Sequence, residues 1–176
     1  MAPDPLTHEE ATDILRALHK SRAEFRASTE GLSEEQAKTK PAPGRWSVLD
    51  CVEHIVLAES RFLSWLENPQ GLPVPPIDHA KEAKLLVGVA SRETRVNAPD
   101  PIQPAGRFAT LAEALQHFDD ARARSVAFAV KQGAGLYSLA AQHAFFGPVN
   151  GAEVMCLMAA HARRHAAQIR EVRAAF

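Results

Sequence analysis

The sequence predicts an all-α fold, a four-helix bundle with one long crossover connection. Four long segments carry apolar residues at helical spacing. Each begins with a cap-like pattern, a Ser, Thr or Asn followed three positions later by Glu or Asp. No segment shows a convincing two-residue strand alternation. Because 176 residues are enough for one sizeable core, we expect a single domain over residues 1–176.

The first helix is expected over residues 8–29. Thr7 and Glu10 form a capping-box pattern at its start, and Gly31 follows its end as a typical terminator. The next residues include the sequence SEEQ at 33–36, which favours one short helical turn. A breaker-rich stretch, PAPGR, then separates this turn from the second long helix.

The second long helix is expected over residues 48–67, with Ser47 and Asp50 as its cap. Residues 68–109 contain most of the prolines and are too long for a tight turn. They therefore predict a connection that crosses the bundle. Within this connection, residues 79–93 form either a short helix or a partly extended part of the crossover.

The last two long helices are expected over residues 111–132 and 151–172. Each follows a cap pattern: Thr110 with Glu113, and Asn150 with Glu153. The segment between them, residues 133–149, contains several glycines and a proline and is interpreted as a loop.

Composition excludes several classes of protein. The net charge of −1 argues against a dominant electrostatic attraction to nucleic acid or to a membrane surface. The first residues lack the basic and apolar regions of a secretory signal, and no apolar run approaches the ~20 residues that span a bilayer. Cys51 and Cys156 cannot form a disulfide framework and fit reduced, buried thiols, so we expect a cytoplasmic protein.

Two histidines on the last helix are the most informative residues. His161 and His165 are four positions apart, so they share one helix face with Cβ atoms roughly 5–6 Å apart. Together with Gln168 they occupy the four-and-three spacing that a bundle helix turns toward its partners. Since an unpartnered buried polar group costs roughly 1–3 kcal/mol, this spacing indicates that something polar is bound there.

His54 on the second helix completes a candidate metal site with His161 and His165. Neutral imidazoles bind divalent ions such as Zn, Ni or Fe, and the sequence does not select among them. Three protein ligands leave a position open for water or substrate, as in catalytic zinc sites. Such an ion activates water or holds a thiol as thiolate. The alternative is three unrelated core histidines.

Other residues near these histidines allow weaker interpretations. The HxxxH spacing resembles the metalloprotease HExxH helix, but Ala162 replaces the required glutamate, which excludes that class. Cys51 is either a fourth ligand or an inert buried thiol. Gln168 either supports a ligand by a hydrogen bond or makes a plain helix contact. His143 is a candidate for the pocket mouth, and Glu53 should face away from the site, which makes it a poor general base.

Two motifs resemble those of the DinB/YfiT-like superfamily. GRWSVLDCVEHIVLAE is similar to the family's second-helix motif, and FFGPVNGAEVMCLMAAHARRHAAQIR is similar to its last-helix motif. The resemblance implies a four-helix bundle in which three histidines, here His54, His161 and His165, hold a divalent metal. Characterised relatives include thiol-dependent transferases and isomerases, and dimers are common in the family.

The leading functional hypothesis is a metal-dependent thiol transferase of the S-transferase type that acts on small molecules. The metal would bind a low-molecular-weight thiol as thiolate and present it to an electrophile. One alternative is a metal-dependent hydrolase. Another is a non-catalytic, stress-related dimer that binds a metal or a ligand. We expect a small-molecule substrate and a homodimer, with neither nucleic acid nor membrane as a partner.

Overall fold

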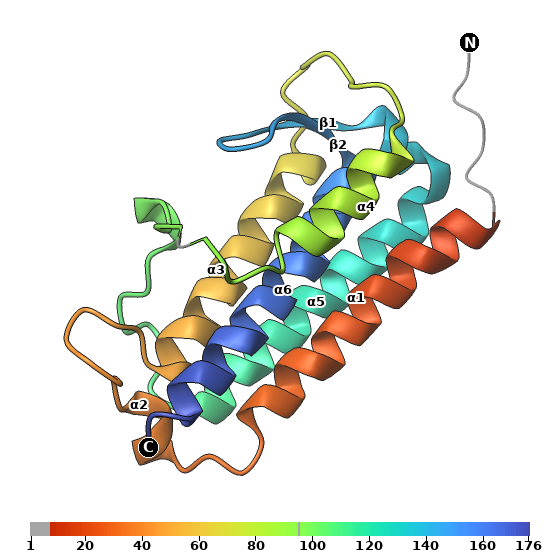
Figure 1. The fold of residues 1–176 in the computed structure, drawn as a ribbon. Helices are drawn as coiled ribbons and strands as arrows, with labels where there is room; N and C mark the ends of the chain where they lie inside the picture. The colour runs from red at the N-terminus through yellow and green to blue at the C-terminus, as the bar shows by residue number, and fades with distance from the viewer. Residues whose placement is uncertain (1–7, 95) are drawn as a thin grey trace.

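The computed structural model describes residues 8–94 and 96–176 and confirms the four-helix bundle (Figure 1). Its long helices are α1 (His8–Thr29), α3 (Val48–Glu67), α5 (Leu111–Gln132) and α6 (Gly151–Arg173). Both α1 and α3 pack against α5 and α6, so α1 lies diagonal to α3. Figure 1 shows that α1 and α6 run in one direction and that α3 and α5 run in the other. Thr7, predicted to cap the first helix, lies outside the described residues, and no described helix is long and apolar enough to cross a membrane.

Side-chain caps fix the starts of the helices that carry the site. At α3, the Ser47 hydroxyl accepts a hydrogen bond from the Asp50 N–H, and the Asp50 carboxylate accepts one from the Ser47 N–H. Asn150 and Glu153 form the same reciprocal pair at α6. A capping side chain typically contributes about 1 kcal/mol. The SEEQ sequence forms the short helix α2 (Glu34–Lys38), as predicted.

The crossover contains one helix, which decides between the two alternatives for residues 79–93. α4 (His79–Gly88) packs along α6, and a short 3-10 turn, η1 (Asp100–Ile102), follows later in the connection. The Lys81 ammonium donates a 2.8 Å hydrogen bond to the buried carboxylate of Glu153. This ion pair links α4 to the start of α6.

A small hairpin, which was not predicted, lies between α5 and α6. After the 3-10 segment η2 (Gly133–Ser138), strands β1 (Ala140–His143) and β2 (Gly147–Asn150) pair antiparallel at one end of the bundle (Figure 1). The prediction of no strand was wrong here because AAQH and GPVN lack apolar alternation and contain alanine and proline, which are poor strand formers. The hairpin packs against α3 and α6, and Gly147, the first residue of β2, has a left-handed backbone with φ of 69°.

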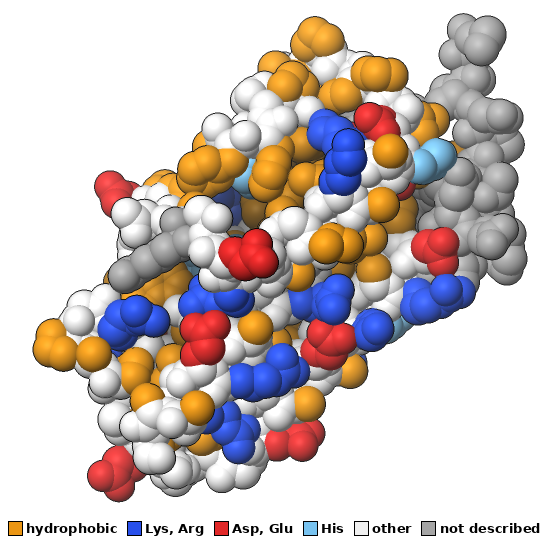
Figure 2. All heavy atoms as spheres, viewed as in Figure 1, with side chains coloured by type: hydrophobic (Ala, Val, Ile, Leu, Met, Phe, Trp, Pro, Cys, Tyr) orange, Lys and Arg blue, Asp and Glu red, His pale blue; other side chains and the backbone are white. Residues whose placement is uncertain are grey.

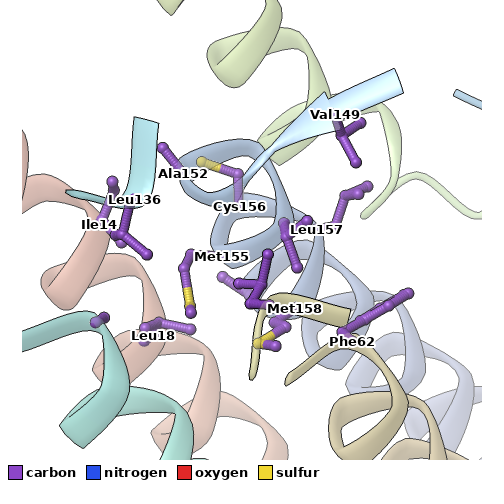
Figure 3. Close-up of a cluster of buried hydrophobic side chains, with 14 of the residues drawn as sticks. Ile14, Leu18, Phe62, Leu136, Val149, Ala152, Met155, Cys156, Leu157 and Met158 are labelled. Carbon is purple, nitrogen blue, oxygen red and sulfur yellow. The ribbon is translucent and has the colours of Figure 1, made fainter. Parts of the chain in front are cut away.

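The core consists of two apolar clusters along the bundle. The first lies toward the hairpin, and Figure 3 shows part of it. Its members include Ile14, Leu18, Phe62, Met155 and Met158. The second lies at the other end and includes Phe25, Val52, Phe118, Ile169 and Val172. Residues 151–160 are buried on all sides of α6, so the first half of this helix is central to the bundle rather than buried along one seam.

Candidate metal centre

The packing of α3 against α6 brings the three predicted histidines together. The Nε2 atom of His161 lies 3.2 Å from Nε2 of His54 and 3.1 Å from Nε2 of His165. One ring nitrogen from each residue lies within 4.8 Å of the other two. In the described part of the chain, this is the one group of three or more histidine, cysteine or acidic side chains with such spacing.

A backbone carbonyl fixes the ring of His54. Its Nδ1 lies 2.7 Å from the carbonyl oxygen of Ile102. A carbonyl oxygen only accepts hydrogen bonds, so Nδ1 carries the proton and Nε2 keeps a lone pair. That lone pair faces the other two histidines. Metal-binding histidines commonly donate their second ring N–H to a carbonyl or carboxylate in this way.

The three Nε2 atoms fit a cation better than they fit shared protons. If Nε2 of His161 carries a proton, this N–H can donate a near-linear hydrogen bond to Nε2 of His54 or to Nε2 of His165, but not to both at once. If Nε2 of His165 carries the proton instead, it donates to Nε2 of His161. The Nε2 atoms of His161 and His54 then face each other with no proton between them. A metal–nitrogen distance of about 2.0–2.1 Å gives a tetrahedral N–N edge of about 3.3 Å, close to the observed separations. The residues present therefore fit a divalent metal.

Burial keeps these imidazoles neutral. Desolvation lowers the pKa of His54, although the hydrogen bond to Ile102 acts in the opposite direction. Desolvation lowers the pKa values of His161 and His165 well below the ordinary value, and the neighbouring histidines lower them further. A metal ligand must be unprotonated, so all three rings are in the binding form at neutral pH.

Aromatic side chains surround the histidines. The ring of Trp46 lies 4.9 Å from that of His54 and 6.1 Å from that of His165, nearly parallel to the latter. Phe62 lies 6.1 Å from His161 on the hairpin side. His54 and His165 are buried, whereas His161 is partly exposed. In Figure 2, which has the orientation of Figure 1, pale blue histidine atoms near the hairpin end of the bundle lie among hydrophobic side chains.

His143 lies beyond Phe62 on the hairpin and is not one of the three clustered histidines. Its Nδ1 accepts hydrogen bonds from the backbone N–H groups of Phe145 and Phe146, at 3.1 and 3.3 Å. The neutral ring therefore carries its proton on Nε2. Burial lowers the pKa of His143. The structure thus places it near the aromatic edge of the site, consistent with the predicted position at the pocket mouth.

The remaining candidates have other contacts. Cys51 is buried outside the histidine group, and burial raises the pKa of its thiol, as expected for an inert thiol. Gln168 accepts a 3.3 Å hydrogen bond from Arg92, which also pairs with Glu171. Both carboxylate oxygens of Glu53 bind the crossover, so this side chain faces away from the histidines, as predicted.

Sequence reasoning missed two contributors to the site. No role at the site was predicted for Trp46, although its place in the GRWS motif was a usable signal. Ile102 acts through its backbone carbonyl, which carries no signal in the sequence. The site therefore includes one element of the crossover as well as the two helices.

Residues 17–169 match the family model of the DinB superfamily. The chain belongs to the DinB superfamily. This DinB chain is 28% identical over 166 residues to a protein of Geobacillus thermodenitrificans (strain NG80-2), an alignment that covers 89% of this chain and 88% of the relative. That relative is named "Putative metal-dependent hydrolase".

A solved structure shows the same fold as this DinB chain. YfiT from Bacillus subtilis superposes with a TM-score of 0.62 at 15% sequence identity, over 99% of this chain and 91% of its own. It is described as "a probable metal-dependent hydrolase with an unusual four-helix bundle topology". The superposition confirms the predicted DinB/YfiT-like bundle, and at this identity it supports the fold alone.

Proposed function

We propose that the chain is a metal-dependent hydrolase of small molecules, with His54, His161 and His165 as the ligands of one divalent ion. The observation that carries the proposal is the convergence of three neutral imidazole nitrogens, with Nε2 separations of 3.1 and 3.2 Å at His161. The naming of the Geobacillus relative as a metal-dependent hydrolase supports the same reaction class.

The chain's own residues prepare the site in three ways. The Ile102 carbonyl holds the His54 proton on Nδ1, which leaves Nε2 free to bind. Burial keeps His54 and His165 uncharged, and the aromatic rings of Trp46 and Phe62 limit the access of water. A divalent metal bound by three imidazoles would supply Lewis-acid activation of a water or of a substrate carbonyl.

Substrate access is expected from the side of His161. His161 as a residue is partly exposed, whereas His54 and His165 are buried at 2% and 6% exposure. The described group contains no carboxylate, so three neutral ligands leave the full charge of the ion to act on substrate and water.

The hydrolase hypothesis replaces the thiol transferase as the leading one. Both hypotheses need an open position on the same three-histidine site, so the geometry does not separate them. The relative covering most of the chain is named for hydrolysis, and no described contact favours a thiol. Non-catalytic binding of a metal or a ligand becomes an outcome of the test.

The test is a paired activity screen. Metal-free protein is reconstituted with Zn(II), Ni(II) or Fe(II) and assayed on a panel of amides and esters, and in parallel on thiols with electrophiles. We expect metal-dependent hydrolysis that is lost in His161→Ala and kept in His117→Ala, an exposed histidine that packs on Phe108. Turnover only with thiols, or inertness in both panels, would contradict the proposal.

A further inference from the structure

Glu53 makes the main polar connection between α3 and the end of the crossover. Its side chain is 1% exposed. Oε1 accepts hydrogen bonds from the Ala105 N–H at 2.7 Å and from Nη1 of Arg107 at 2.6 Å. Oε2 accepts from the N–H groups of Gly106 and Arg107, at 3.0 and 3.1 Å. One carboxylate thus receives four hydrogen bonds from three consecutive residues.

We propose that Glu53 is a positioning residue for the candidate metal site. It holds residues 102–107, called the 102–107 segment below, so that the Ile102 carbonyl stays against Nδ1 of His54. This role rests on the proposed function in one respect: a fixed His54 ring matters most if that ring binds a metal.

The helix geometry explains how adjacent residues hold one segment at two points. Successive side chains on an α-helix point about 100° apart, so Glu53 and His54 leave α3 in different directions. His54 contacts the 102–107 segment at Ile102, and Glu53 contacts it at residues 105–107. The segment begins at the last residue of the short turn η1 and belongs to neither strand of the hairpin, so these contacts take the place of the hydrogen bonds of a regular strand or helix.

Two further hydrogen bonds hold the 102–107 segment in shape. The side-chain amide of Gln103 donates to the carbonyl of Ala98, just before the segment, at 2.6 Å, and Nη1 of Arg107 donates to the Gln103 carbonyl at 3.1 Å. Arg107 therefore contacts both the carboxylate of Glu53 and the backbone next to Ile102. Charge-assisted bonds of this kind are shorter and stronger than neutral ones.

The consequence for His54 is the choice of tautomer. A neutral imidazole carries its proton on Nδ1 or Nε2, and in water the Nε2–H form predominates. The Ile102 carbonyl reverses this preference, because it accepts a hydrogen bond from Nδ1 only. If the carbonyl moves away, the Nε2–H form competes with metal binding at the same nitrogen. Loss of such supporting contacts typically lowers metal affinity about 10- to 100-fold.

Glu53→Gln tests the proposal. The variant keeps the side chain's size but places an amide NH₂ against backbone N–H donors. Glu67→Gln is the control, because Glu67 lies on the same helix and pairs with Arg124 on the surface. Arg107→Ala is a milder variant that leaves three of the four bonds, so it keeps the proposal testable if Glu53→Gln fails to fold. The first readout is the ¹⁵N NMR signature of the His54 tautomer in metal-free protein, and the second is Zn(II) affinity by competition titration.

We expect Glu53→Gln to shift His54 toward the Nε2–H form and to weaken Zn(II) binding about 10- to 100-fold. Arg107→Ala should show the same changes to a smaller extent, and Glu67→Gln should behave as wild type. A tautomer and an affinity that stay unchanged in Glu53→Gln would overturn the proposal, even if the melting temperature falls. If wild type binds no Zn(II), the proposed function fails, and the tautomer measurement still decides the role of Glu53.

Discussion

The guanidinium of Arg122 donates two hydrogen bonds to the carboxylate of Glu59, with N–O distances of 2.6 and 2.9 Å. Both side chains are almost fully buried, at 1% and 3% exposure. Arg122 also donates to the Leu18 carbonyl and to the Ser21 hydroxyl on α1, at 2.6 and 2.7 Å. This pair joins three helices through a polar contact in the interior of the bundle.

Breaking the pair on one side should be strongly destabilising. Glu59→Leu leaves the Arg122 guanidinium buried without its counter-charge, which typically costs about 3–5 kcal/mol. The double variant Glu59→Leu with Arg122→Leu removes both charges and should be less destabilised than the single variant. Urea unfolding of the three proteins measures the difference, and a double variant at least as unstable as Glu59→Leu would contradict the expectation.

The metal-free protein should lose stability as the pH falls through about 6.5. Burial lowers the pKa of His54, His161 and His165 in the folded protein, while in the unfolded chain they titrate near 6.5. Below that pH the unfolded chain binds more protons, so the free energy of unfolding decreases. Each pKa unit of lowering at one histidine removes at most about 1.4 kcal/mol.

Urea unfolding between about pH 5 and 7.5 with a chelator present measures this pH dependence. This pH range lies above the titration of Glu53, because the hydrogen bonds from residues 105–107 together outweigh the effect of burial and lower the pKa of that carboxyl. His165→Leu removes one buried titrating ring, so the free energy of unfolding should fall less steeply with decreasing pH in this variant than in wild type. An equal slope in the variant and in wild type would show that His165 does not contribute.

Trp46 should report on metal binding by fluorescence. Its ring lies against His54 and His165, and the chain has one other tryptophan, Trp65. In Trp65→Phe, Ni(II) or Co(II) should quench the remaining emission and saturate at one ion per chain, because these ions quench a fluorophore at short range. Trp46→Phe is the matched control, and stronger quenching of Trp65 than of Trp46 would place the ion elsewhere.

The helices could be predicted from the sequence because their start signals are local. Ser47 with Asp50 and Asn150 with Glu153 define two starts that the structure reproduces as capping boxes. The hairpin at residues 140–150 could not be predicted, because its strands have little strand propensity and pack against α3 and α6, which are distant in the sequence or follow it. The single domain over residues 1–176, the homodimer and the cytoplasmic location stay predictions.

The candidate site could be predicted only as far as side-chain type and spacing allow. His161 and His165 follow from helical periodicity, and the structure places His54 beside them across the α3–α6 contact. The Ile102 carbonyl could not be predicted, because any residue carries a carbonyl and only the crossover conformation brings this one to His54. The role proposed for Glu53 depends on that same conformation.

Metal stoichiometry in the His161→Ala variant tests the central claim most directly. Wild type, His161→Ala and His117→Ala are loaded with Zn(II), dialysed near neutral pH and measured by elemental analysis, with helix content checked by circular dichroism. The three-histidine site predicts one ion per chain in wild type and in His117→Ala, and almost none in a folded His161→Ala. A full equivalent of tightly held metal in His161→Ala would contradict it.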